Sequence, residues 1–176
     1  MEARLYDRMA RSHPYQQLVC EGAIQVVGDK YQGSFLELGT GTGNVVMAIA
    51  DLTNNSAQVI GLDNSQAALK VARAKFPEES HNISFVEGDL DRPLPFATAS
   101  FDGVIANNSL YLVGDISKTI AEGLRVLRPG GLLVMSNPVD KESPDSDPAN
   151  IFKAHLKEQW RLYRAWHILP VASLMF

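Results

Sequence analysis

The chain has 176 residues, of which 45% are apolar and 20% charged, and its formal net charge is −4. This length and balance predict one globular domain, residues 1–176, with a sizeable core, and the net charge supplies no basic field that would attract nucleic acid. We expect a cytoplasmic protein, because the N-terminus does not resemble a signal peptide and no apolar run reaches the roughly eighteen residues of a membrane span.

The segment before the first predicted strand, residues 1–33, contains a helical pattern. A helix is expected to begin near Ser12, with Pro14 in its first turn, and to end at Gly28. The only cysteine, Cys20, excludes an internal disulfide and a cysteine-built metal site. Because Cys20 lies in the helical pattern, we expect a small buried side chain rather than a reactive thiol. The apolar face of this helix consists of Tyr15, Leu18, Val19, Ala23, Val26 and Val27.

A glycine-rich turn follows the first predicted strand. The strand covers residues 34–38, the turn GTGTG covers 39–43, and an apolar helix covers 44–52. A second strand, residues 58–62, ends on Asp63, about twenty residues beyond the glycines. Glycines let the backbone approach a ligand, and the start of the helix offers N–H groups to an anion. This βαβ unit is typical of a nucleotide site; a tight turn that merely packs the helix on the strand is the alternative.

The remaining elements continue to alternate between helix and strand. A helix capped by Asn64 or Ser65 carries an apolar face as far as Phe76 and is stopped by Pro77, and Asp115 is expected to cap a later helix. The alternation predicts an α/β fold, a Rossmann-like doubly wound parallel sheet with helices on both faces. The later elements are expected at strand 83–87, strand 103–106, helix 116–127 and strand 132–136.

The composition changes after the fifth predicted strand. Residues 138–150 form a loop rich in proline, serine and acidic residues, and residues 151–166 fit an amphipathic helix with a basic face. A solvated basic face is the simpler interpretation of this helix. A lid that meets an anionic substrate or a membrane surface is the alternative.

The spacing of the glycines distinguishes between nucleotides. A dinucleotide fingerprint requires G-x-G-x-x-G, whereas this chain has G-x-G-x-G with Asn44 next, and Glu37 precedes the first glycine by two residues. The pattern E-x-G-x-G-x-G resembles motif I of class I S-adenosylmethionine (SAM) dependent methyltransferases. Three further segments are similar to this family: VIGLDNSQAALKVA, FVEGDLDRPLPFATASFDGVIANNSLYL and LRVLRPGGLLVMSN. The resemblance covers residues 34–137 and is greatest to the small-molecule methyltransferases of quinone biosynthesis. It implies the strand order 3-2-1-4-5.

The resemblance implies a SAM-binding core over residues 34–137 and assigns roles around the glycine turn. Glu37 would take the ammonium group of the methionine moiety. The backbone of Gly39, Thr40 and Gly41 would pass beneath the methionine moiety and the sugar, and Gly43 completes the motif.

Further cofactor-binding residues are implied at the ends of the later strands. Asp63 would bind the ribose hydroxyls, and Asn64 would flank the adenine. Asp89 would accept from the adenine amino group, Leu90 would offer its backbone N–H, and Asn107 would face the methyl group, with Asn108 lining the same opening. Simpler interpretations remain open: Asp63 as a helix-capping acid, Asp89 as a turn residue, and Asn107 and Asn108 as turn formers.

No catalytic residue is identified from the sequence. Methyl transfer from a sulfonium needs chiefly alignment, and a general base is required only if the acceptor must lose a proton. His13 and His155 are the better placed candidates for such a base, although each of the four histidines, His81 and His167 included, also fits an ordinary surface or packing role. Asp102 is expected to be structural, because it begins the fourth strand, whereas the cofactor would bind at the carboxyl ends of the strands.

The resembling fold usually continues with two more strands, but only forty residues follow Ser136. Either the C-terminal part is incomplete, which the apolar terminus and an otherwise exposed fifth strand favour, or the sheet stops at five strands. The sequence is interpreted as a SAM-dependent methyltransferase, an enzyme of the EC 2.1.1 type, with a small-molecule acceptor, no metal, and no nucleic-acid or integral membrane partner. Residues 1–33 would cover the cofactor, and residues 138–176 would form a loop and a lid-like helix. A homo-oligomer is left open. The rivals are a non-catalytic methyltransferase-like binding module and a nicotinamide oxidoreductase, which Asn44 disfavours.

Overall fold

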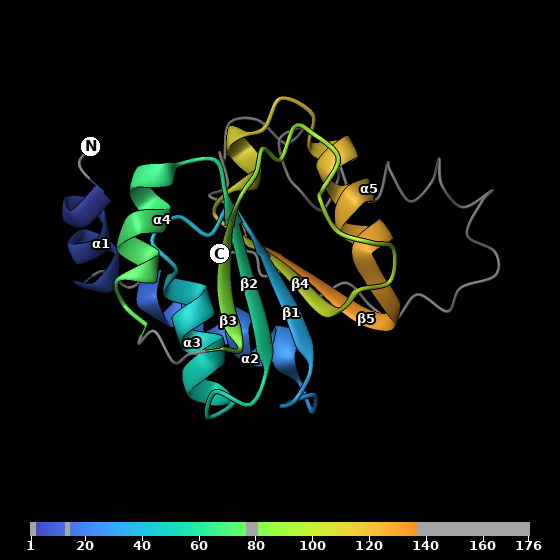
Figure 1. The fold of residues 1–176 in the computed structure, drawn as a ribbon, viewed down its shortest axis with the longest axis horizontal. Helices are drawn as coiled ribbons and strands as arrows, with labels where there is room; N and C mark the ends of the chain where they lie inside the picture. The colour runs from blue at the N-terminus through green and yellow to red at the C-terminus, as the bar shows by residue number, and fades with distance from the viewer. Residues whose placement is uncertain (1–2, 13–14, 77–80, 137–176) are drawn as a thin grey trace.

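The computed structural model describes residues 3–12, 15–76 and 81–136 (Figure 1). Its strands are β1 Ser34–Leu38, β2 Gln58–Asp63, β3 Ile83–Glu87, β4 Phe101–Asn107 and β5 Leu127–Ser136. Its helices are α1 Ala3–Ser12, α2 Tyr15–Val27, α3 Asn44–Leu52, α4 Gln66–Arg73, the short 3-10 helix η1 Leu110–Leu112, and α5 Ile116–Val126.

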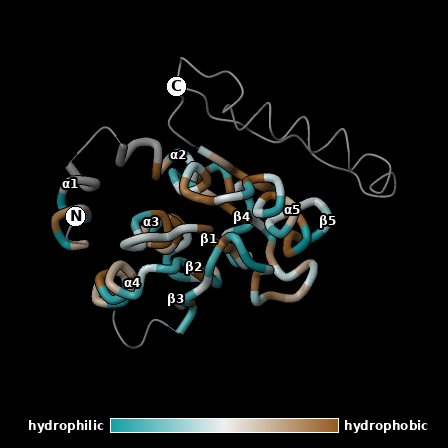
Figure 2. The backbone as a smooth tube through the Cα atoms, turned by 90° about the horizontal axis from the view of Figure 1, so that it is seen from above, coloured by the Kyte–Doolittle hydropathy of each residue, from teal (hydrophilic) through white to brown (hydrophobic). Residues whose placement is uncertain are grey.

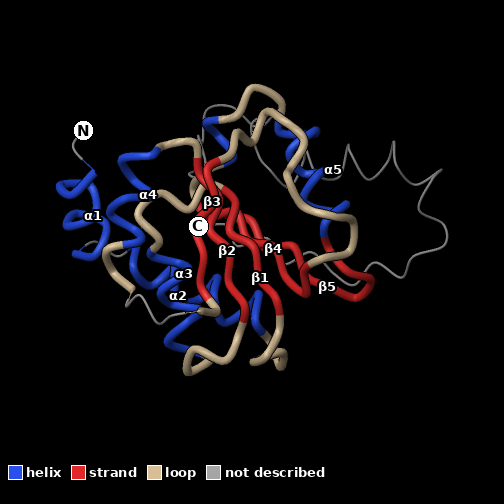
Figure 3. The backbone as a smooth tube through the Cα atoms, in the orientation of Figure 1, coloured by secondary structure: helices blue, strands red, loops and turns tan. Residues whose placement is uncertain are grey.

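The five strands form one parallel sheet in the order β3-β2-β1-β4-β5. This order confirms the predicted doubly wound topology. All strands run the same way, so their carboxyl ends lie together at one edge of the sheet (Figure 3). Such an edge is where open α/β sheets bind ligands.

Helices cover both faces of the sheet, with α1 to α4 on one side and α5 on the other (Figure 2). Alternation along β1 explains both layers, because Leu36 and Leu38 pack toward α5 whereas Phe35 packs toward α2 and α3. The α5 side buries Leu62, Val104, Ile120, Val126 and Leu133. The opposite side buries Val19, Ala23, Val26, Val46, Ile49, Val59 and Ile105.

The N-terminal region differs from the prediction in two ways. Residues 3–12 form the separate helix α1, where we expected no helix before Ser12. Cys20 is exposed, so the prediction of a buried side chain is wrong. The buried stripe of α2 runs through Val19 and Ala23, and Cys20 lies one position off that stripe and faces outward.

The boundaries of the last two strands also differ. β5 begins at Leu127, although the sequence RPGG at 128–131 predicted a turn. Phe101 pairs with Leu127 and Gly103 pairs with Leu132, so the intervening residues make an irregular excursion within the ladder. The predicted loop and helix of residues 138–176 lie outside the described residues, as do His13, His155 and His167.

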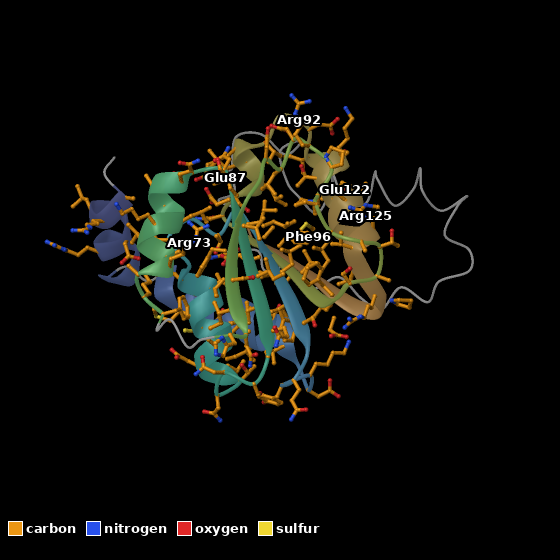
Figure 4. All side chains as sticks on the ribbon, viewed as in Figure 1. Arg73, Glu87, Arg92, Phe96, Glu122 and Arg125 are labelled. Carbon is orange, nitrogen blue, oxygen red and sulfur yellow. The ribbon has the colours of Figure 1, made fainter. Side chains whose placement is uncertain are left out.

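The long connection between β3 and β4 is anchored to α5. Arg125 donates to the backbone oxygens of Phe96, at 2.8 Å, and Leu94, at 3.1 Å. Glu122 pairs with Arg125 at 2.7 Å and accepts the Leu94 N–H at 2.7 Å, and Figure 4 shows both side chains beside Phe96. Hydrogen bonding to Arg125 holds the pKa of Glu122 below its ordinary value. These contacts fix the connection that begins at Asp89 and Leu90, the residues predicted to meet the adenine.

Asp102 lies at the amino-terminal edge of the sheet. Its Oδ2 accepts the Ser34 N–H at 2.9 Å and the Arg128 guanidinium at 2.6 Å. Asp102 therefore joins the starts of β1 and β4 to β5, a structural role far from the carboxyl ends of the strands.

Asp102→Ala should lower the free energy of unfolding by about 1–2 kcal/mol, because the Ser34 N–H and Arg128 both lose their acceptor. Arg128→Ala should cost less than about 1 kcal/mol, because that side chain is 44% exposed and its ion pair is screened by solvent. Urea unfolding of both variants measures the difference. A loss for Asp102→Ala no larger than that for Arg128→Ala would contradict the role given to the bond with Ser34.

Candidate functional site

The glycine turn crosses the end of β2. The backbone N–H groups of Gly39 and Thr40 both donate to the Leu62 oxygen, at 2.8 and 3.0 Å, and the Gly43 N–H donates to the Thr40 oxygen at 2.8 Å. Gly43 has φ 76° and is the N-cap of α3. The turn is thereby held rigidly between β1, β2 and the start of α3.

The glycines serve different purposes within the turn. A Cβ at Gly39 would lie 2.3 Å from the Cβ of Ser109, so this position needs glycine for packing. At Gly41, where φ is +52°, a Cβ would have no heavy atom within 4 Å. The backbone at Gly41 therefore faces open space, which a ligand could occupy.

Glu37 is a buried carboxylate, 2% exposed, at the end of β1. Burial raises its pKa to about 8, and this effect outweighs the hydrogen bonds from the Thr40 hydroxyl, at 2.5 Å, and the Val46 N–H, which lower it. The Val46 N–H belongs to the first turn of α3, so Glu37 satisfies a free donor of that helix. A carboxyl group held this way favours a neighbouring cation, which would stabilise its charged form.

Asp63 lies on the other side of the turn, at the end of β2. Its Oδ2 accepts the Gly41 N–H at 2.7 Å, and its Oδ1 accepts the Ser65 N–H at 2.8 Å. Ser65, not Asp63, caps α4, because its hydroxyl accepts the Ala68 N–H. The charge of Asp63 raises the pKa of Glu37, so the two acids interact electrostatically across the turn.

Asp89 and Leu90 begin the connection after β3. Asp89 is exposed and accepts the Asp91 N–H at 2.9 Å, so it forms the turn that its sequence also suggested. The Leu90 oxygen accepts from Thr119 of α5 at 3.1 Å. Asp91 accepts the Gly114 N–H at 2.8 Å, which joins this connection to the segment after β4.

The end of β4 forms the other part of the edge. The side chain of Asn107 accepts the Ser136 hydroxyl of β5, and Asn108 has φ +55°. Asn108 therefore serves as a turn residue. Ser109, which we did not predict, is buried and donates to the Leu38 oxygen at 2.6 Å. Only its position after two asparagines at a strand end could have drawn attention to it.

The structure therefore brings Glu37, Thr40, Gly41 and Asp63 together by direct contacts. Asn64 is exposed beside Asp63. Asp89, Leu90 and Asn107 lie at the same edge of the sheet, at or beyond the carboxyl ends of β3 and β4. Their functional roles remain predictions.

The described residues contain no group of three or more histidine, cysteine or acidic side chains placed to hold a metal ion. His81 is exposed and lines a hollow near the amino-terminal ends of β1 and β2, away from the glycine turn. None of the described helices has the length and hydrophobicity needed to cross a membrane.

A parallel sheet with a glycine turn between two acids defines an α/β protein of the nucleotide-binding kind. A protein family described as "Methyltransferase domain" matches residues 29–170. The chain belongs to this methyltransferase family, whose class I members use S-adenosylmethionine as cofactor. The prediction of the family and of its cofactor is thereby confirmed.

Individual relatives agree with this classification. The chain is 36% identical, over 73% of its length, to a demethylmenaquinone methyltransferase of Lactococcus lactis, of which it spans 52%. It is 28% identical, over 94% of its length, to a 2-phytyl-1,4-naphtoquinone methyltransferase of Thermosynechococcus vestitus, of which it spans 72%. An S-adenosylmethionine dependent methyltransferase from Mesorhizobium loti matches 67% of this chain and 51% of its own, with 28% identity and a TM-score of 0.57.

The buried carboxyl group of Glu37 makes stability depend on pH in a predictable direction. Below pH 4.5, its ordinary pKa, both the folded and the unfolded chain hold the proton. Between 4.5 and about 8 the folded chain keeps a proton that the unfolded chain has released, so this group makes stability fall as pH rises. Glu37→Gln should remove that fall and raise the melting temperature near pH 8.

Glu122→Gln provides the matched control, because the pKa of Glu122 is lowered by hydrogen bonding to Arg125. Glu122 therefore contributes stability above its ordinary pKa, and its loss should lower the melting temperature near neutral pH. Thermal unfolding of both variants from pH 5 to 9 measures the contrast. Equal destabilisation of both variants at pH 8 would contradict the assignment to Glu37 of a buried carboxyl group with a raised pKa.

Proposed function

We propose that this chain binds S-adenosylmethionine at the carboxyl ends of β1 to β4 and transfers its methyl group to a small apolar acceptor that carries a quinol-type ring. The observation that carries the proposal is the pair of acids, Glu37 and Asp63, on either side of a glycine turn whose Gly41 faces open space. The chain spans about half the length of the demethylmenaquinone methyltransferase of Lactococcus lactis. The methyltransferase activity of the whole protein is therefore also part of what we propose.

The two acids would each bind a different part of the methyl donor. The buried Glu37 would be stabilised by the ammonium group of the methionine moiety, because a cation offsets the burial of its charge. Asp63, oriented by the N–H groups of Gly41 and Ser65, keeps lone pairs for the two ribose hydroxyls. The backbone from Gly39 to Gly41 would lie beneath the sugar.

The remaining cofactor contacts would come from the later strands. Asn64 would flank the adenine, Asp89 would accept from its amino group, and the Leu90 N–H would reach the ring. Asp89 already accepts the Asp91 N–H with one oxygen, which orients the carboxylate and leaves its other oxygen for a ligand. Asn107 would face the methyl group from the end of β4.

The chemistry places few demands on the protein. The cofactor supplies a methyl group on a positively charged sulfur, an activated leaving group. The residues of the chain need chiefly to align the acceptor with this group, and such positioning can supply about 7–11 kcal/mol. A rigid glycine turn held by Leu62 and Ser109 suits that task.

An apolar surface lies beside the proposed methyl position. Tyr111 and Leu112 of η1 come shortly after Asn107 and Asn108 in the chain, separated from them by Ser109 and Leu110, and they are 55% and 73% exposed. Exposed apolar side chains next to a polar crevice are typical of a surface that receives an apolar ligand. The relatives from Lactococcus lactis and Thermosynechococcus vestitus, whose names specify quinone acceptors, favour a ring of this kind.

Calorimetric titration with SAM tests the donor site. Asp63→Ala should weaken SAM binding roughly 10–100-fold, because two charge-assisted hydrogen bonds of about 1.5–3 kcal/mol each are lost and water partly replaces them. Asp63→Asn retains an acceptor for the Gly41 N–H and separates the effect of charge from that of the turn. Asp51→Ala, an exposed aspartate of α3, is the control. SAM affinity unchanged in both Asp63 variants would exclude this ribose site.

Turnover distinguishes the enzyme from a non-catalytic binding module. The chain should transfer a labelled methyl group from SAM to a soluble 1,4-naphthoquinol, and Tyr111→Ala should raise the KM for the quinol without changing the affinity for SAM. SAM binding without transfer to any quinol or other small apolar acceptor would favour the binding module.

A further inference from the structure

A buried polar cluster connects α1 to the glycine turn. Lys75, which follows α4, forms an ion pair with Asp7 of α1 and donates to Asn44 Oδ1 at 2.8 Å. The Thr42 hydroxyl donates to the same oxygen of Asp7 at 2.8 Å. We call Asp7, Thr42, Asn44 and Lys75 the α1 latch.

The latch is well shielded from solvent. The side chains of Lys75 and Asp7 are only 7% and 14% exposed, and Thr42 is 2% exposed. An ammonium group at this depth requires a nearby anion and acceptors, because burial of an unpaired charge is costly. Lys75 therefore holds Asp7, and with it α1, against α4, beside which α1 lies in Figure 1.

The latch meets the turn at the residues on either side of Gly43. Thr42 precedes this glycine and Asn44 begins α3, so the latch holds the backbone on both sides of the left-handed N-cap. Burial raises the pKa of Glu37, and the positive charge of Lys75 acts weakly in the opposite direction, as expected for a cation near this carboxyl group. The hydrogen bonds of Thr42 and Asn44 thus connect the latch to the proposed cofactor site.

We propose that Asp7 and Lys75 are positioning residues for SAM: they hold the glycine turn in its binding conformation without touching the cofactor. The proposal rests on the proposed function, because it concerns the same site. It gives α1 a role at the site, since Asp7 of this short, charged helix contacts both Thr42 and Lys75.

The experiment compares SAM dissociation constants of single and double variants by calorimetry, at a temperature where every variant is folded. Asp7→Asn and Lys75→Met should each weaken SAM binding roughly tenfold, and the double variant should be no weaker than the poorer single variant, because the two residues act as a unit. Arg8→Gln and Lys70→Met, which remove exposed cations of α1 and α4, should bind SAM as the wild type does.

A second pair of variants avoids the burial of an unpaired charge. Thr42→Val removes the hydroxyl that donates to Asp7 while nearly preserving side-chain volume, and Thr42→Ser retains it. Thr42→Val should weaken SAM binding several-fold, and Thr42→Ser should restore it. These variants test the latch even if Lys75→Met does not fold.

The outcomes separate this proposal from the proposed function. Lower melting temperatures with SAM dissociation constants within twofold of the wild type would show a purely structural latch and overturn the inference, while the proposed function would stand. A folded wild-type chain that binds no SAM would overturn the proposed function, and the latch would then lose its role in cofactor binding.

Discussion

The burial of Glu37 beneath the first turn of α3 is the constraint on which the candidate site depends. Water is excluded around this carboxyl group, and the Thr40 hydroxyl and the Val46 N–H only partly offset the loss of hydration. An apolar side chain at this position would be cheaper for the fold alone. The strain is understandable if a positively charged ligand supplies the missing interaction, as the ammonium group of SAM would.

The rest of the fold supplies the geometry around that group. Parallel strands bring the ends of β1 and β2 to one edge, so that Asp63 reaches the Gly41 N–H across the glycine turn. The turn is fixed from three sides: by Leu62 beneath it, by Ser109 against Gly39, and by the α1 latch beyond Gly43. A site held so firmly has little to reorganise when a ligand binds, which favours both affinity and alignment.

Local signals in the sequence account for most of the fold. Apolar strands, the glycine turn and the caps Ser65 and Asp115 predicted the elements and their order, because each depends on neighbouring residues. The helix α1 was missed, since the partner that anchors Asp7 is 68 residues away along the chain. The early start of β5 was missed because RPGG at 128–131 has the composition of a turn, and only pairing with Phe101 reveals the strand.

The residues of the candidate site also fall into two groups, those that the local sequence predicts and those that only the tertiary structure reveals. The acids at 37 and 63 could be placed from their spacing to the glycines, and the structure joins both to the turn. The sequence could not decide between ligand-binding and turn-forming roles for Asp89 and Asn108, because both roles use the same short polar side chains. The contacts of Ser109 and Lys75 with the turn region arise only from tertiary packing.

The proton balance of SAM binding tests the role of Glu37 most directly; it is measured by calorimetry at pH 7 in buffers that differ in ionisation enthalpy. Since the pKa of Glu37 is about 8 in the free chain, its carboxyl group is mostly protonated at pH 7 and should release its proton when the ammonium group of SAM arrives. We expect binding with net proton release in the wild type and no such release in Glu37→Gln. Binding with the same proton balance in both proteins would show that Glu37 does not meet the cofactor and would overturn its assigned role.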